Sequence, residues 1–313
     1  MCLLKPENRT FKPTYDREML LMLCAPALMA VYFYGIRALC LIILGVLLSQ
    51  LVSALCDRIL GKKVRFISPG AAVTGLLTVL MLPASSSWTL AAVAVLFAFA
   101  VACLPFGNGS KTPFVPAAAG IAFVTVCRTS SVFTYPFLLY DVVAKNDPDF
   151  TAGTSLASML RSGSSVYGSL SSVTEVFIGD YSGAMGTGCA LVLLVVPIYL
   201  LVKHKDRFLI YLGYITAVVV FAALFPRILT GSLISVVMEL CAGAVLFGGV
   251  FLLTAPCGSP RKPTACLLYG ITGGIVVMLF NRYGVYEDCT CFAVLIMNAL
   301  CPLFGRKKAK EVL

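Results

Sequence analysis

Long apolar segments separated by polar connections occupy most of the chain, which has 313 residues. A helix needs about 17–25 predominantly apolar residues to cross a bilayer, and most of the segments reach that length. The apolar segments lie at residues 19–35, 38–56, 67–82, 87–104, 115–128, 184–202, 208–225, 230–254, 265–280 and 290–304. This pattern predicts an all-α polytopic membrane protein with about ten transmembrane helices. The third and fifth segments are short, and we expect tilted or broken helices there.

Composition agrees with this prediction. Only 12% of the residues are charged and 59% are hydrophobic, and the mean hydropathy is +0.95. Soluble domains carry about 25% charged residues. The first twenty residues are polar and mixed in charge, without the apolar core and cleavage site of a signal peptide. We therefore expect the first apolar segment to be retained and to span the membrane.

Basic residues fall mainly in alternate connections, which predicts the orientation. If the N-terminus is cytoplasmic, 18 of the 24 Lys and Arg residues lie on the cytoplasmic side and 6 lie outside. Cytoplasmic loops of membrane proteins carry such an excess, so both termini are expected inside. The polar segment 129–183 is then extracytoplasmic, and its acidic residues outnumber its basic ones. The same bias explains the net charge of +10, since no basic face or aromatic platform indicates nucleic-acid binding.

Two stretches share the pattern G-A-x-x-x-G followed by seven residues and then a proline. They are "GAAVTGLLTVLMLP" (70–83) and "GAVLFGGVFLLTAP" (243–256). Five predicted spans separate them, and an odd number gives the two halves opposite orientations, as in the inverted repeats of transport proteins. Small residues at such spacing also serve simple helix packing. We predict a first five-helix repeat at 1–128, an extracytoplasmic loop at 129–183 and a second five-helix repeat at 184–313.

Few residues offer acid–base or metal chemistry. Most of the thirteen cysteines lie in apolar segments, where free cysteine behaves as a small hydrophobe. Cys289 and Cys291 form a C-x-C pair that lacks partners of matching spacing for a metal or redox site. The single histidine, His204, argues against a histidine-based metal site or triad. Glu239 either lines a polar path through the membrane or marks a broken helix with its carboxylate at an interface.

Several long blocks, in order along the chain, carry a resemblance to a known family. They are "YFYGIRAL" (32–39), "ISPGAAVTGLLTVLMLPASSSW" (67–88), "PAAAGIAF" (116–123), "FIGDYSGAMG" (177–186) and "CFAVLIMNALCPL" (291–303). In these blocks the chain resembles the membrane subunits NqrB and RnfD, of the sodium-pumping NADH:quinone oxidoreductase and the Rnf ferredoxin:NAD oxidoreductase. Its length fits RnfD better.

The resemblance implies a covalent flavin. In the family, a threonine in an S/T-G-A-T-like motif carries FMN through a phosphoester bond, attached by a flavin transferase on the extracytoplasmic side. The matching stretch is Thr151, Ala152, Gly153 and Thr154, followed by Ser155, with the small pair in swapped order. Thr154 is the expected attachment site, with Thr151, Gly153 and Ser155 beside the flavin. "TAGTS" also suits a plain polar turn.

The resemblance further implies an electron-transfer subunit of a redox-driven ion translocase in the bacterial cytoplasmic (inner) membrane. Its partners would be NADH-binding, iron–sulfur and second FMN-bearing subunits. The chain has no NAD fingerprint and no iron–sulfur cysteine set, so we expect no turnover from it alone. Two other interpretations remain open at this point: an inverted-repeat transporter or channel without flavin, and a flavin-free scaffold subunit.

This chain departs from the family at several polar positions. The usual phenylalanine–asparagine–proline–alanine motif reads "FVPA" (114–117), and a lysine usual before "FG" (106–107) is absent. Pro69 and Ala255 stand where the family has aspartates, and Thr187 stands where it has a glutamate. Polar groups within membranes are costly and usually functional. These changes bear on ion coupling and on the family's second, noncovalent flavin such as riboflavin.

Overall fold

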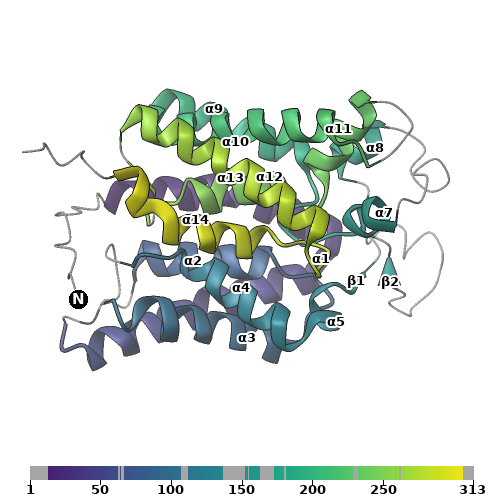
Figure 1. Ribbon diagram of the computed structural model, residues 1–313. Coiled ribbons are helices and arrows are strands. Elements are labelled where there is room, and N and C mark those ends of the chain that lie inside the picture. The colour runs from purple at the N-terminus through teal and green to yellow at the C-terminus, as the bar shows by residue number, and fades with distance from the viewer. Residues whose placement is uncertain are drawn as a thin grey trace, which may run out of the picture.

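The computed structural model shows a bundle of helices with their axes roughly along one direction (Figure 1). It describes residues 13–62, 64, 67–106, 112–136, 152–153, 155–162, 173–179, 181–227, 232–257, 259–260 and 262–305. Within this part of the chain, three helices are long and apolar enough to cross a membrane, or four if one bent pair counts as a single span. Five shorter apolar helices of 10–17 residues accompany them. The protein is thus mostly helical, as a polytopic membrane protein is expected to be.

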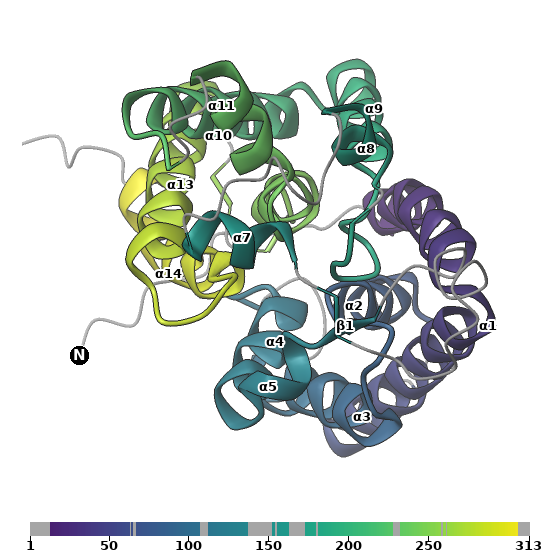
Figure 2. The same ribbon diagram turned by 90° about the vertical axis from the view of Figure 1, so that its right-hand side faces the viewer.

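The first helix, α1 (Pro13–Ile59), turns back on itself at Gly35, where φ is 68° and ψ is −152°. A straight helix of this length would measure about 70 Å. Instead, the Asp16 carboxylate lies 3.1 Å from where a Cβ of Gly70 would stand, and the Gln50 side chain bonds Ser68, so both ends of α1 reach the same place. Figure 2 accordingly shows α1 as two helices seen end-on. They correspond to the predicted spans 19–35 and 38–56.

Three further helices complete the first half. They are α2 (Pro69–Leu80), α3 (Trp88–Phe97), which continues as the π-helix η1 (Ala98–Cys103), and α4 (Pro116–Cys127). Proline at the start of α2 and α4 suits a helix N-terminus, because the first N–H groups have no partner within the helix. The short α5 (Thr129–Val132) follows α4. The three longer helices begin and end within two residues of the predicted apolar segments.

Short elements connect the halves at one end of the bundle. Strands β1 (Tyr135–Pro136) and β2 (Ala152–Gly153) form the small antiparallel sheet, and helices α7 (Leu156–Ser162) and α8 (Val173–Ile178) follow. Residues 181–189 then run in non-helical conformation across the end of α2, where the N–H groups of Met185 and Gly186 donate to the carbonyls of Leu82 and Leu80. The predicted span 184–202 is therefore wrong at its start, because these N–H groups serve another helix.

Among its described residues, the second half contains five apolar elements. They are α9 (Ala190–Lys203), α10 (Lys205–Leu224), the bent pair described next, α13 (Pro263–Tyr283) and α14 (Thr290–Gly305). The bent pair consists of α11 (Ser232–Cys241) and α12 (Val245–Phe247), which continues as the π-helix η3 (Gly248–Leu253). The helix axis bends by 66° between the two arms of this pair, around Gly243, whose φ is 54°. The single predicted span 230–254 is in fact this broken helix.

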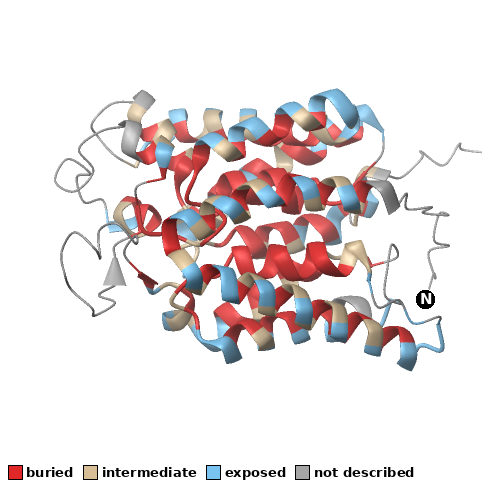
Figure 3. Ribbon diagram, turned by 180° about the vertical axis from the view of Figure 1, so that it is seen from behind, coloured by how far each residue is buried: buried red, intermediate tan, exposed pale blue. Residues whose placement is uncertain are grey.

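Glycines allow the closest helix contacts in both halves. Gly75 of α2 faces Gly45 of α1, where an added Cβ would lie 2.5 Å from the Gly45 carbonyl oxygen. Gly213 of α10 faces α13 in the same way, because an added Cβ there would lie 2.6 Å from the Leu267 carbonyl oxygen. Small residues let helix backbones approach in membranes, where packing replaces the hydrophobic drive between helices. Figure 3 shows buried residues filling the middle of the bundle and exposed residues along its outer helices, where α1 and α9 present leucine, isoleucine and valine.

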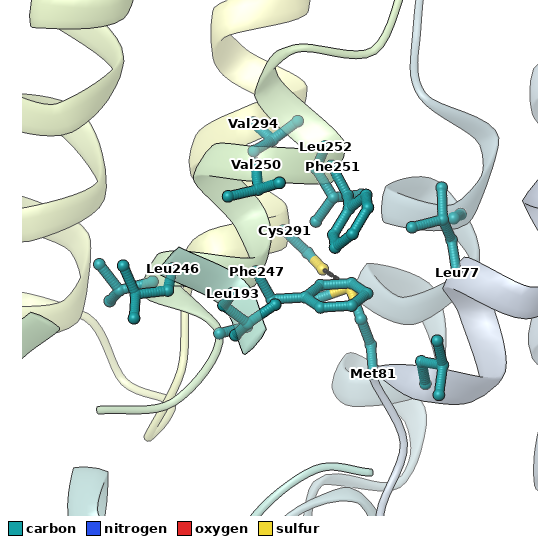
Figure 4. Close-up of a cluster of buried hydrophobic side chains, with 14 of the residues drawn as sticks. Leu77, Met81, Leu193, Leu246, Phe247, Val250, Phe251, Leu252, Cys291 and Val294 are labelled. Atoms are coloured by element: carbon teal, nitrogen blue, oxygen red, sulfur yellow. Dashed lines mark hydrogen bonds between the residues drawn. The ribbon is translucent and has the colours of Figure 1, made fainter. Parts of the chain in front are cut away.

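A buried apolar cluster joins the two halves. Leu77 and Met81 at the end of α2 pack with Phe247 and Phe251 of the bent pair and with Cys291 of α14 (Figure 4). The Sγ of Cys291 lies 3.7 Å from the Sδ of Met81. All five side chains are at most 7% exposed. The contact between the halves is therefore apolar at its centre.

The two stretches that share the G-A-x-x-x-G pattern run in opposite directions. The start of α2 lies beside Asp16, and its end lies beside Cys291. The second stretch begins at Gly243, close to Asp288, and near its other end the carbonyl oxygen of Thr254 lies 3.5 Å from the hydroxyl of Tyr15. The first stretch therefore starts at the end of the bundle at which the second stretch ends, and the reverse holds at the other end.

Candidate functional site

A pocket opens between the two halves at the end of the bundle that carries β1, β2 and α7. Its empty volume is about 550 Å³, including space open to solvent. The lining residues come from the first half (Met81, Ile121, Thr125, Val132, Phe133, Tyr135), from the connecting chain (Ser155, Leu156, Ala157, Tyr181, Ser182, Gly183, Ala184, Thr187) and from the second half (Gly243, Asp288, Cys291, Phe292).

The described part of the predicted flavin motif lies at or next to this pocket. Gly153 pairs with Tyr135 and Ala152 pairs with Pro136 in the β1–β2 ladder. Ser155 pairs with Ser182 in an isolated parallel bridge. Thr151 and Thr154 themselves lie outside the described residues. Of the four predicted site residues, the structure therefore brings Gly153 to the pocket-lining Tyr135 and Ser155 to the pocket itself.

Ser155 begins helix α7 and reaches across to the second half. Its Oγ accepts the backbone N–H of Ser158 at 3.0 Å, as an N-cap residue does, and donates to Oε2 of Glu287 at 2.9 Å. The Oγ of Ser158 in turn donates to the carbonyl of Ser155 at 2.8 Å. Ser155 is only 6% exposed. A short polar helix start is thus tied to the α13–α14 connection, 132 residues later in the chain.

Arg161, in the last turn of α7, makes a second tie to the same connection. Its guanidinium donates to the carbonyls of Tyr286 at 2.6 Å and Gly284 at 2.7 Å. Burial raises the pKa of the nearby Glu287 carboxyl, and the hydrogen bond from Ser155 and the positive charge of Arg161 oppose that rise. Glu287 is therefore a carboxyl whose proton is held more tightly than that of an exposed glutamate.

Asp288 stabilises the break between α11 and α12. Its Oδ2 accepts the N–H of Ala244 at 2.7 Å, and its Oδ1 accepts the N–H of Thr290 at 2.9 Å, at the start of α14. An added Cβ on Gly243 would lie 3.1 Å from Oδ2. Both carboxylate oxygens are committed to backbone groups, so Asp288 shapes the pocket wall.

Two tyrosines hold the chain that crosses the pocket. The Tyr34 hydroxyl donates to the carbonyl of Gly183 at 2.9 Å and accepts its N–H at 3.2 Å. The Tyr181 hydroxyl lies 2.9 Å from the carbonyl oxygen of Cys241 and 3.2 Å from that of Thr187. Tyr135 is also buried, and burial raises its pKa well above 10, so its phenol keeps its proton. The hydroxyls of Tyr135 and Tyr181 belong to lining residues of the pocket.

Three aromatic rings line up at one side of the pocket. Tyr286 stacks on Phe292 with centroids 5.4 Å apart and on Phe133 with centroids 6.4 Å apart. Phe133 and Phe292 line the pocket directly. Such flat apolar surfaces suit a planar ring system. Cys291 contributes a thiol to the pocket wall, and no group of metal-ligating side chains occurs among the described residues.

Glu239 lies near the break in the second half and is paired. Its Oε1 lies 2.9 Å from Nε of Arg227, and the side chains are 3% and 12% exposed. Glu239 belongs to α11, two residues before Cys241, where that helix ends. Of the two interpretations of Glu239, the structure agrees with the broken helix whose carboxylate lies at an interface.

Sequence reasoning located part of this site and missed the rest. Tyr135, Glu287 and Asp288 were not among the predicted site residues. The stretch "YGVYEDCT" (283–290) carries a signal, since two acidic residues stand between two apolar segments. Its connection to Ser155 is a long-range contact, which local pattern does not reveal.

Known proteins resemble the chain over nearly its full length. The model of the NQR2, RnfD, RnfE family matches residues 8–312. The D subunit of the Na(+)-translocating ferredoxin:NAD(+) oxidoreductase complex of Acetobacterium woodii is 28% identical, covering 90% of this chain and 84% of that protein. The D subunit of the ion-translocating oxidoreductase complex of Stutzerimonas stutzeri is 26% identical, covering 94% and 91%. The proton-translocating counterpart of Clostridium ljungdahlii is 24% identical, covering 91% and 87%. Because the family model matches nearly the whole chain, this chain belongs to the NQR2, RnfD, RnfE family.

Proposed function

We propose that this chain is the RnfD-type electron-transfer subunit of an Rnf ion-translocating ferredoxin:NAD oxidoreductase complex, with FMN joined to Thr154 through a phosphoester bond. The observation that carries the proposal is the position of the motif at the pocket between the halves: Ser155 lines the pocket, and Gly153 pairs with the pocket-lining Tyr135. The three relatives named above are each described as the D subunit of such a complex.

The wall of the pocket offers groups of the kinds that contact flavins. Phe133 and Phe292 offer flat apolar surfaces to a ring. Ser155, Tyr135 and Tyr181 offer hydroxyls, and the backbone of Gly183 lies in the wall. A bound flavin supplies electron transfer, while the protein sets its position and surroundings. Ser155 and the β1–β2 ladder would fix the chain beside the attachment point, and the apolar floor of Met81 and Cys291 would exclude water.

The architecture supports the finer details of the proposal. Two inverted five-helix repeats require that 70–83 and 243–256 run antiparallel, as they do. A total of ten spans is reached if the α1 hairpin counts as two spans and the broken α11–α12 pair as one. The charge bias supports both termini inside and residues 129–183 outside. Partners would be NADH-binding, iron–sulfur and a second FMN-bearing subunit of the complex in the cytoplasmic membrane.

Covalent flavin is tested by coexpressing the chain with a flavin transferase and viewing a denaturing gel under ultraviolet light. We expect a fluorescent band that disappears in Thr154→Ala and persists in the matched control Thr151→Ala. The intact mass should exceed that of the polypeptide by one FMN less water. A bare polypeptide mass and a dark band would favour the flavin-free transporter or scaffold instead. Flavin released by acid precipitation would report the second, noncovalent flavin.

A further inference from the structure

Two stripes of exposed apolar side chains run along α10 and α13. On α10 these side chains are Leu212, Val220 and Leu224, and on α13 they are Leu268, Ile275, Leu279 and Tyr283. Thr216 and Thr272 lie within the stripes, and each hydroxyl donates to a carbonyl of the preceding turn, so neither requires water. Helical spacing keeps each stripe on one face of its helix.

The two helices run parallel and pack on each other, so the stripes are neighbours (Figure 2). Arg207 near the start of α10 bonds Ser259, shortly before α13, and Arg282 in the last turn of α13 bonds the carbonyl of Phe225, directly after α10. An added Cβ on Gly274 would lie 2.6 Å from the carbonyl oxygen of Tyr214. Lipid chains that cover one stripe therefore also meet the other.

Two arginines stand where the stripes reach the pocket end of the bundle. Nη1 of Arg282 donates to the carbonyl of Phe225 at 2.6 Å, and its guanidinium lies 5.8 Å from the centre of the Phe225 ring. Arg227 follows α10, and its Nε lies 2.9 Å from Oε1 of Glu239. Its Nη2 is buried without a hydrogen-bond partner among the described residues. The cluster thus retains donors that it does not use.

Positive charge exceeds negative charge in this cluster. Arg282 and Arg227 both act on the single carboxylate of Glu239. Burial lowers the pKa of Arg227, Glu239 opposes that change, and Arg282 and Arg161 lower the pKa further. Arg161 is bound to two carbonyls, and its charge acts on Glu287 as well. A negative group beside Arg282 and Arg227 would therefore relieve their mutual repulsion.

We propose that the pocket end of α10 and α13 binds an anionic phospholipid, with its phosphate on Arg282 and Arg227 and its acyl chains along the two stripes. Guanidinium groups donate paired N–H groups to phosphate oxygens, and basic sites between membrane helices bind anionic headgroups. A zwitterionic headgroup adds a cation where positive charge is already in excess, so the site favours a lipid with net negative charge. The inference is independent of the flavin.

The surroundings of the arginines favour a lipid over a soluble anion. Phe225 is 51% exposed, Tyr283 is 76% exposed and Val285 is 83% exposed, all close in the chain to one of the two arginines or to its partner. Aromatic side chains gather at the level of lipid headgroups. A free phosphate ion would leave these apolar surfaces uncovered, whereas a phospholipid covers them and the stripes together.

The first test measures headgroup preference. The full chain, purified in a neutral detergent, is given equal amounts of phosphatidylglycerol and phosphatidylcholine with identical acyl chains, and native mass spectrometry counts the bound lipids. We expect a preference for phosphatidylglycerol that falls about fivefold in Arg282→Met, the usual effect of one basic residue at a membrane surface. Arg282→Lys keeps the charge and should keep most of the preference.

The matched control is Arg58→Met, which removes an exposed arginine at the opposite end of the bundle. Its preference should equal that of the unchanged chain. An equal loss in Arg58→Met, or no preference in the unchanged chain, would overturn the proposal. Release of phosphatidylglycerol by millimolar inorganic phosphate would also overturn it, since the site would then take a free anion.

The second test locates the lipid. In a Trp88→Phe background, Leu279→Trp places a fluorophore in the α13 stripe, and Val195→Trp places one on the exposed face of α9. In bilayers of phosphatidylcholine with a minor share of brominated phosphatidylglycerol, we expect stronger quenching at position 279 than at 195. Adding Arg282→Met should remove the difference and leave quenching at 195 unchanged, which also shows that the variant is folded. Equal quenching at both positions in the protein with Arg282 would contradict the proposed site.

Discussion

Gly243 shows how a single backbone torsion shapes the site. Its φ of 54° lies in the left-handed region, which residues with a Cβ rarely adopt. That torsion turns α11 into α12 and exposes the N–H of Ala244 to Asp288. One glycine therefore determines both the bend of a span and one wall of the pocket.

Gly243→Ala should destabilise the protein by about 1–3 kcal/mol, because the added Cβ meets a strained torsion and lies 3.1 Å from Oδ2 of Asp288. Thermal unfolding in detergent, followed by thiol accessibility, measures the loss. Gly188→Ala is the matched control, since the nearest atom to its added Cβ is 3.8 Å away on Phe33. Equal melting temperatures for the two variants would contradict this account of Gly243.

Glu287 should make stability depend on pH in a defined direction. Burial raises its pKa above the ordinary value of 4.5, so its favourable contribution is fully present below pH 4.5 and is lost as pH rises through the raised pKa. Relative to Glu287→Gln, the unchanged protein should therefore lose stability on going from acid to neutral pH. Denaturation of both proteins across that range checks the sign. A difference that stays constant with pH would show that the carboxyl keeps its ordinary pKa.

At the scale of helices and strands, the apolar pattern predicted most boundaries well. It succeeded where a helix meets lipid or core along its whole length, as in α4 and α13. It failed at 184–189, where backbone N–H groups serve the carbonyls at the end of α2, and at the break around Gly243. In both places the deciding partner lies far away in the sequence. The tie between Ser155 and Glu287 was unpredictable for the same reason.

The pair Arg227–Glu239 holds the end of α11 and permits a sharper test. Removing one partner of a buried ion pair leaves an uncompensated charge and costs about 3–5 kcal/mol. Arg227→Met should therefore destabilise the protein strongly, since the Glu239 side chain is 3% exposed.

The double variant Arg227→Met/Glu239→Leu serves as its control. Replacing a buried pair by apolar residues of similar size is often neutral, so the second change should recover most of the lost stability. The unchanged protein, Arg227→Met, Glu239→Leu and the double variant form a double-mutant cycle, and thermal unfolding measures the stability of each. Additive losses would mean that the two charges do not interact.

At the scale of the whole molecule, the pocket and the cluster around Tyr15 lie at opposite ends of the bundle. Arg207 lies over the Tyr15 ring at 5.8 Å, and His204 pairs with Glu18 at that same end. The charge bias predicts that this end is cytoplasmic and that the pocket faces outside. The orientation decides whether a transferase outside the cell could reach the predicted flavin motif.

Cysteine labelling of intact cells tests this orientation. In a background without native cysteines, Ser162→Cys at the exposed end of α7 should react with a membrane-impermeant maleimide from outside. Lys62→Cys, exposed after α1 at the opposite end, should react only after permeabilisation. The reverse result would place the pocket in the cytoplasm and overturn the flavin proposal with it.

The bond between Ser155 and Glu287 also has a consequence in time. The ribosome makes Ser155 132 residues before Glu287, and the carbonyls that hold Arg161 follow it by 125 and 123 residues. While the second half is being synthesised, none of these ties can exist. A maturation enzyme that works during this interval would meet the motif before α13 and α14 close over it. Chain elongation would then set the order of events, with the cofactor attached first and the helix pair docked afterwards.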